Sequence, residues 1–175
     1  MQQQSSHTLR VEVSSLTIGL DGYAKYNSTD CSLTYDAAEN RAELYAHAAA
    51  NGAWRQAGSR IVVMVGFLTL IFEGVPSILT SLDAYTNSTH WMGCDIVLPE
   101  LTGSGALALT DERVEDDRLS ITGEAKYDVD RERKILRIGL GRPEGAFYFE
   151  VGSNLVAGLR DAYLQELIFT NVTFD

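Results

Sequence analysis

The chain has 175 residues, of which 45% are hydrophobic and 22% are charged. This length and composition predict a single domain with a sizeable core, and they exclude disorder as its main state. The formal net charge is -10, so a phosphate backbone or an anionic lipid surface would be repelled and neither is expected as a partner. The longest apolar stretch, residues 61–72, is shorter than the roughly 20 residues that a membrane helix needs.

The N-terminal residues do not have the pattern of a secretory signal, because no charged region leads into an apolar one. We therefore expect a cytoplasmic protein. In a reducing cytosol, Cys31 and Cys94 are expected to be two small buried hydrophobes rather than a disulfide. Residues 1–8 are polar and are predicted to be a flexible tail, while residues 9–175 are predicted to form the single domain.

Alternation of apolar and polar side chains predicts strands in the first third of the chain. Asp21-Gly22 has the composition of a two-residue hairpin turn. Strands are expected at 9–13, 16–20, 23–26 and 31–36. Residues 36–52 fit a helix that begins with a capping box at Asp36 and Glu39, but they also fit an alternating strand, so this choice stays open.

The rest of the chain predicts mainly strands. Segment 61–73 is the most hydrophobic, and its lack of alternation predicts one central strand covered on both faces. Further strands are expected at 94–98, 106–109, 119–127, 135–140, 146–151 and 167–174, with a short helix or strand at 78–82, a charged hairpin loop at 128–134 and one or two helical turns at 153–165. This pattern predicts an all-β fold, an antiparallel closed β-barrel of about eight strands with one or two short helices.

A search for catalytic and ligand-binding motifs finds no signature. None of the three histidines, His7, His47 and His90, lies in a nucleophile-elbow context. Gly139-Leu140-Gly141 is not followed by a helix with the Lys-Ser/Thr pair of a phosphate loop, and the acidic residues at 128, 130 and 132 lack the glycine and glutamate of a calcium loop. No metal and no cofactor are therefore predicted.

A closed barrel of about eight strands encloses space for one small molecule. Eight Tyr, six Phe and two Trp would supply a lining suited to a bulky, mostly apolar ligand. The residues nominated to bind that ligand are Tyr85, His90, Trp91, Tyr45 and Phe147. The polar tail, with Gln2, Gln3, Gln4 and His7, is expected to close over the barrel mouth as a lid.

Two segments of the C-terminal half resemble a known family. The strand-turn-strand pattern of the small allene oxide cyclase-like β-barrels resembles residues 117–128 (DRLSITGEAKYD), followed by a short turn and residues 135–147 (ILRIGLGRPEGAF). An earlier part of the pattern resembles residues 33–36 (LTYD). Some members of that group are natural-product cyclases, including those that catalyse intramolecular [4+2] cycloadditions in spirotetronate biosynthesis. The resemblance implies a cofactor-independent cyclase that folds a flexible polyketide-type substrate into its reactive conformation, for which acid-base residues are optional.

Other functions remain open at this point. Residues 67–109, with a polar loop that holds Trp91, resemble the strand-loop-strand of invertebrate H-type lectins, which implies stacking of the indole on a sugar. A non-catalytic ligand carrier and a structural oligomer subunit, for example a homodimer that uses 61–72 at its interface, are the remaining alternatives. A deep apolar pocket would favour the cyclase or the carrier. A shallow polar surface with an aromatic rim would favour the lectin, and a filled interior with an exposed apolar face would favour the structural subunit.

Overall fold

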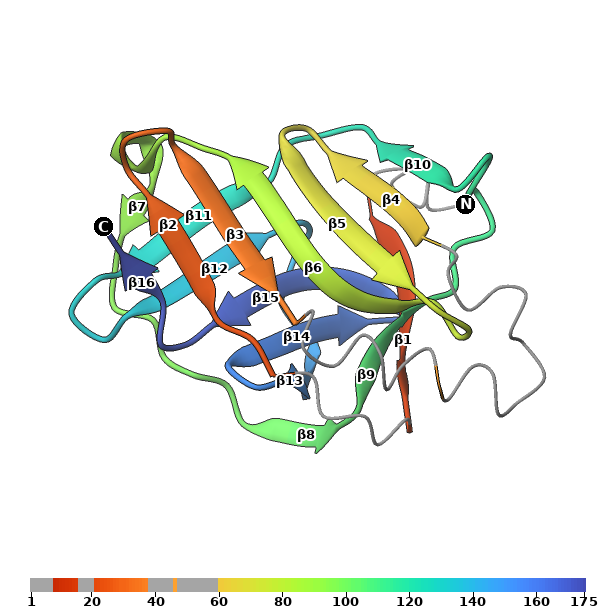
Figure 1. Cartoon of the computed structure of the whole chain (residues 1–175). Coiled ribbons are helices and arrows are strands. Elements are labelled where there is room, and N and C mark those ends of the chain that lie inside the picture. Colours follow the sequence, from red (N-terminus) through yellow and green to blue (C-terminus); the bar gives the residue numbers. More distant parts are fainter. Residues whose placement is uncertain (1–7, 16–20, 38–45, 47–59) are drawn as a thin grey trace.

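The computed structural model describes residues 8–15, 21–37, 46 and 60–175. Its described residues form an all-β fold, as predicted, with two packed layers of strands (Figure 1). The first layer contains β10 (Arg118–Ile121), β4 (Arg60–Val65), β5 (Leu68–Glu73), β6 (Ile78–Tyr85), β3 (Ser32–Asp36), β2 (Ala24–Asn27) and β16 (Thr173–Phe174), in this spatial order. The second contains β7 (Met92–Gly93), β11 (Lys126–Asp130), β12 (Ile135–Gly139), β15 (Tyr163–Phe169), β14 (Leu155–Arg160), β13 (Phe147–Gly152) and β8 (Leu101–Ser104).

Two further strands, β1 (Leu9–Ser14) and β9 (Ala106–Leu109), connect the layers. Leu9 and Arg10 pair with β15 of the second layer, and the rest of β1 pairs with β9. β9 in turn meets the start of β6 in the first layer, at Ile78. The pair of β1 and β9 therefore links the hydrogen bonding of the two layers.

The strand pairing differs from the predicted barrel. Along the described residues the hydrogen-bonded path starts at β10 and ends at β7, so a closed barrel of about eight strands is not confirmed. The pairing is also not purely antiparallel, because β4 with β10, β7 with β11, β8 with β13 and β2 with β16 are parallel pairs. Each of these parallel pairs includes a strand of two to four residues at an end of the path or of a branch.

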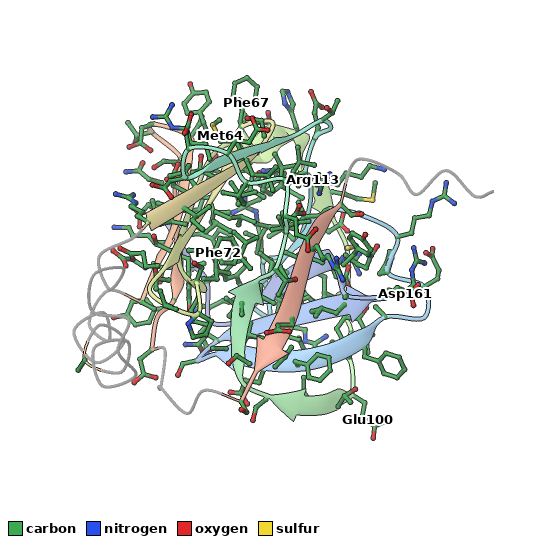
Figure 2. All side chains as sticks on the ribbon, turned by 90° about the vertical axis from the view of Figure 1, so that its right-hand side faces the viewer. Met64, Phe67, Phe72, Glu100, Arg113 and Asp161 are labelled. Carbon is green, nitrogen blue, oxygen red and sulfur yellow. The ribbon has the colours of Figure 1, made fainter. Side chains whose placement is uncertain are left out.

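Side chains from both layers fill the space between them. The rings of Tyr35 on β3 and Phe169 on β15 face each other across the layers with their centroids 5.4 Å apart. Tyr26, Phe72 and Leu70 are also fully buried in this core. Figure 2 shows Phe72 among the side chains between the layers, whereas Phe67 and Glu100 lie at opposite ends of the molecule.

The predicted single strand at 61–73 is wrong, because this segment is the hairpin of β4 and β5. Its turn lies at Gly66 and Phe67, where Gly66 has a positive φ of 59° that favours glycine. Phe67 is 75% exposed at the tip. The continuous apolar run concealed the turn, because no polar residue marks it.

The predicted helical turns at 153–165 are also wrong, since this segment forms β14, a turn and the start of β15. The register between β14 and β15 shifts at one point: Leu159 pairs with Leu164 and Gly158 with Glu166, which leaves Gln165 as an extra residue. Such a β-bulge breaks the two-residue alternation. For this reason the sequence from 163 to 166 does not have the pattern of a strand.

Three smaller corrections concern strand limits. Residues 94–98 are not a strand, residues 119–127 belong to two strands, β10 and β11, and 167–174 is divided between β15 and β16. Segment 78–82 is part of β6, and β11 extends into the predicted loop as far as Asp130. The predictions at 1–7, at 16–20 and for most of the open choice at 36–52 lie outside the described residues.

Candidate functional site

Trp91 is a core residue, in contrast to the exposed ligand-stacking role nominated from the sequence. It follows the short 3-10 helix η3 (Ser88–His90), and only 8% of it is exposed. Its indole N–H donates a hydrogen bond to Oγ1 of Thr86 at 2.9 Å. Its ring contacts Tyr26 of the first layer and Tyr127 of the second, with centroids 4.5 and 5.8 Å away. The indole thus fixes the 86–91 loop to both layers.

The other nominated residues that the structure describes do not gather into one site. Tyr85 is 68% exposed at the end of β6, and His90 is exposed in η3. Phe147 is 63% exposed on β13, and β13 lies far from η3 in the molecule (Figure 1). Tyr45 and the proposed lid residues Gln2, Gln3, Gln4 and His7 lie outside the described residues.

A different site appears on the face of the second layer that points away from the first. Residues 94–100 cross this outer face, because they connect β7 at one edge of the layer to β8 at the other. Ile96, in the middle of the crossing, is 1% exposed and packs on Ile135 and Ile168. Its N–H donates to Oδ2 of Asp130, and Arg133 donates to its carbonyl oxygen at 2.8 Å.

Beside this small apolar cluster, polar side chains from four strands of the second layer form a row, in which β14 lies between β13 and β15. The members of this polar row are Tyr148 of β13, Glu166 of β15, Arg137 of β12 and Asp128 of β11. The Tyr148 hydroxyl donates a hydrogen bond to Oε1 of Glu166 at 2.7 Å. At the other end of the row, Nε and Nη2 of Arg137 both donate to Oδ2 of Asp128, at 2.9 and 2.6 Å.

Glu166 is the least solvated member of the row and has the fewest partners for its charge. Its side chain is 6% exposed, against 24% for Asp128 and 33% for Arg137. Oε2 of Glu166 lies 4.0 Å from Nε of Arg137, which makes a long ion pair but no hydrogen bond, and among the described residues no group donates a hydrogen bond to it. A buried carboxylate oxygen without a donor is unusual, because burying an unsatisfied charged group costs free energy.

The environment keeps Tyr148 and Arg137 in defined protonation states. Burial, the hydrogen bond to Glu166 and the charge of Glu166 together raise the pKa of Tyr148 well above its usual value. The phenol therefore stays protonated and remains a donor. Burial on its own would lower the pKa of Arg137, but the hydrogen bonds that its guanidinium donates to Asp128 and the two nearby carboxylates raise it, so the guanidinium stays charged.

The backbone under the row holds Tyr148 in place. Tyr148 pairs with Gly158 of β14, and Gly158 pairs with Glu166. A Cβ atom at Gly158 would lie 2.8 Å from Cε1 of Tyr148 and 3.2 Å from Cγ of Glu166. The glycine thus leaves room for the aromatic ring to lie over the strand and for the hydroxyl to reach the carboxylate.

Sequence reasoning did not identify the row, because its members fall in different predicted elements and Glu166 falls in none. Glu166 lies between the predicted helical turns at 153–165 and the predicted strand at 167–174, Asp128 lies in the predicted loop and Arg137 in a predicted strand. A useful signal was present in residues 164–169 (LQELIF). A charged residue within an otherwise apolar strand is buried only with partners, so Glu166 pointed to a polar cluster.

Within the described ranges, no three His, Cys, Asp or Glu side chains are grouped so that they could hold a metal ion. None of the helical segments in that part of the chain is long and apolar enough to cross a membrane. A scan against protein-family models finds no match, and a search of curated proteins also finds none. The resemblance to the allene oxide cyclase-like barrels therefore stays a prediction.

Proposed function

We propose that this protein binds a small, mostly apolar molecule on the outer face of its second layer, and that the molecule donates a hydrogen bond to Oε2 of Glu166. The observation that supports this proposal is the side chain of Glu166, which is 6% exposed and has one oxygen without a donor among the described residues. A ligand N–H or O–H at this oxygen would satisfy it.

The surroundings of Glu166 suit such a ligand. Tyr148 touches both Glu166 and the apolar cluster of Ile96, Ile135 and Ile168, so polar and apolar contacts are available side by side. Val156 and Cys94 extend this apolar cluster. Ligand sites commonly combine an apolar wall with a few fixed polar groups that set the orientation.

This site replaces the interior of a barrel as the location of the ligand. Tyr26, Tyr35, Phe72 and Phe169 occupy the space between the layers, and the outer face has the unsatisfied polar group. Cyclisation of the bound molecule, including a [4+2] cycloaddition, stays a prediction. Under that prediction the row would hold one end of the substrate while the apolar cluster bends its chain.

A titration with three matched aromatic probes tests the proposal. Benzyl alcohol donates a hydrogen bond, whereas benzyl methyl ether has the same benzyl group without a donor. Both probes make the same apolar contacts through the aromatic ring. We expect benzyl alcohol to shift amide resonances at Tyr148, Glu166 and Ile168, and benzyl methyl ether to bind more weakly. Toluene itself, as the third probe, gives the apolar contribution alone.

The variant Glu166→Gln places an amide where the carboxylate was and should weaken benzyl alcohol binding, because hydrogen bonds to charged groups are about twice as strong as neutral ones. Glu112→Gln removes an exposed acidic residue and serves as the matched control. Equal binding of alcohol and ether, or resonance changes confined to other parts of the protein, would contradict the proposal.

A carbohydrate is a second candidate ligand for the same row. Sugar hydroxyls bind to carboxylates and guanidinium groups, and the row has two carboxylates, Asp128 and Glu166, and the guanidinium of Arg137. Tyr148 adds an aromatic ring. These groups are the polar side chains and the aromatic ring that a lectin needs. Binding of benzyl β-glucoside through its sugar, with no response to benzyl alcohol, would favour this candidate.

A further inference from the structure

We infer that the group recognised by Glu166 is a protonated amine, so that the ligand is an organic cation with an apolar body. This inference rests on the proposed function and specifies its ligand class. It follows from the balance of charge in the polar row, from the aromatic ring beside the carboxylate and from the overall charge of the chain.

The polar row carries two carboxylates and one guanidinium, which leaves one negative charge in excess. The positive charge of Arg137 lies mainly with Asp128, since two of its N–H groups donate to Oδ2 of Asp128 at 2.9 and 2.6 Å. With Glu166 the guanidinium makes only a long ion pair of 4.0 Å and no hydrogen bond. A cation at Oε2 would balance the excess negative charge of the row, whereas a neutral hydroxyl would leave this excess in place.

The position of Tyr148 also favours an ammonium group. Its hydroxyl donates to Oε1 of Glu166, so the hydroxyl oxygen keeps a lone pair that can accept an N–H from a cation at Oε2. The electron-rich face of an aromatic ring attracts cations as well. A carboxylate with an adjacent tyrosine therefore provides two of the contacts that an alkylammonium group uses.

Long-range electrostatics act in the same direction. With a formal net charge of -10, the protein attracts cationic ligands and repels anionic ones before contact. The apolar cluster of Ile96, Ile135 and Ile168 next to Tyr148 would receive the carbon skeleton. A primary amine attached to an aromatic or aliphatic body fits all of these features.

Comparison of benzylamine, protonated at neutral pH, with benzyl alcohol tests the inference by calorimetry and amide-resonance titration. We expect the amine to bind at least about tenfold more tightly, because an ion pair with the poorly solvated carboxylate replaces a hydrogen bond from a neutral donor. Glu166→Gln should remove this preference and leave both probes with similar affinities. Glu112→Gln should retain the preference.

A second variant protects the test against a simple loss of folding. Arg137→Gln removes the positive charge of the row, so it should increase the affinity for benzylamine and widen its preference over benzyl alcohol. A partly unfolded protein would not bind more tightly. Raised ionic strength should weaken benzylamine binding and leave benzyl alcohol unaffected.

The outcomes separate the inference from the proposed function. Equal affinities of amine and alcohol at the row, or unchanged benzylamine affinity in Arg137→Gln, would overturn the inference and leave the proposed function in place. If neither probe perturbs residues of the row, the inference and the proposed function are both wrong.

Discussion

Gly158 and Tyr148 occupy facing positions on β14 and β13, and a Cβ atom on Gly158 would lie 2.8 Å from Cε1 of the tyrosine. The ring therefore lies over a position that has no side chain. This relationship sets the hydroxyl 2.7 Å from the buried carboxylate of Glu166, so the site depends on a residue that contributes no atom to a ligand contact.

Gly158→Ala should displace the Tyr148 ring and break its hydrogen bond to Glu166. We expect a loss of about 1–3 kcal/mol in the free energy of unfolding, typical of an overpacked site, together with weaker binding of the benzyl probes. Urea denaturation measures the first effect and titration the second. Gly139→Ala is the matched control, because a Cβ there would meet Cβ of Lys126 at an ordinary 3.8 Å. Equal effects of the two substitutions would contradict this explanation.

Acid should destabilise the protein partly through Asp111. Burial alone would raise the pKa of this carboxyl, but hydrogen bonds from Arg113 and from the backbone N–H of Arg10 and Arg113 lower it to about 2. Because the folded pKa lies below the unfolded one, the stabilisation is present above about pH 5 and is lost as the pH falls toward 2, and it amounts to about 2 kcal/mol.

Unfolding followed by urea at a series of pH values measures this effect. Asp111→Asn cannot ionise, so its stability should fall less steeply between about pH 5 and pH 2 than that of the wild type. Glu112→Gln changes the exposed neighbouring residue and should keep the steep wild-type profile. Parallel profiles for the wild type and Asp111→Asn would show that Asp111 does not contribute.

The segment that crosses the outer face should depend on Ile96. Ile96→Ala removes a side chain that is 1% exposed, and we expect a cost of about 2–4 kcal/mol in the free energy of unfolding. Val97 next to it is 81% exposed, so Val97→Ala should change stability by less than about 0.5 kcal/mol. If both substitutions have the same small effect, residues 94–100 are not held on the outer face by this contact.

Trp91 and His90 are adjacent in sequence but should respond differently to substitution. Trp91→Phe removes the indole N–H that donates to Thr86 and part of the contact with Tyr26 and Tyr127, at a cost of about 2 kcal/mol or more in the free energy of unfolding. His90→Ala alters an exposed residue and should be nearly neutral. Thermal unfolding of both variants checks this difference, and a neutral Trp91→Phe would be contrary to a core role.

The sequence predicted well the elements whose alternation continues without interruption. In β1, Leu9 and Val11 are buried and Arg10 and Glu12 are exposed, as expected from their pattern. β3 shows the same correspondence at Leu33 and Tyr35. For these strands, one face packs on the core and the other meets solvent, so the local pattern contains the necessary information.

The errors occur where the local pattern does not determine the structure. The bulge at Gln165 shifts the alternation within β15, and the extended segment around Ile96 buries an apolar residue by crossing a layer instead of pairing with a strand. The candidate site was missed for a related reason. The polar row is built from four strands, which contribute Tyr148, Glu166, Arg137 and Asp128. These side chains lie close together because of the strand order and register, and neither can be derived from composition or spacing.

The position of β1 has a consequence for how the chain acquires its structure. Leu9 pairs with Leu164 and Val13 with Leu107, so β1 pairs with strands that are synthesised long after it. Such distant pairings slow folding, because a long loop must close before they form. During synthesis, β1 has neither of these partners until β9 has been made, and its pairing with β15 follows later still.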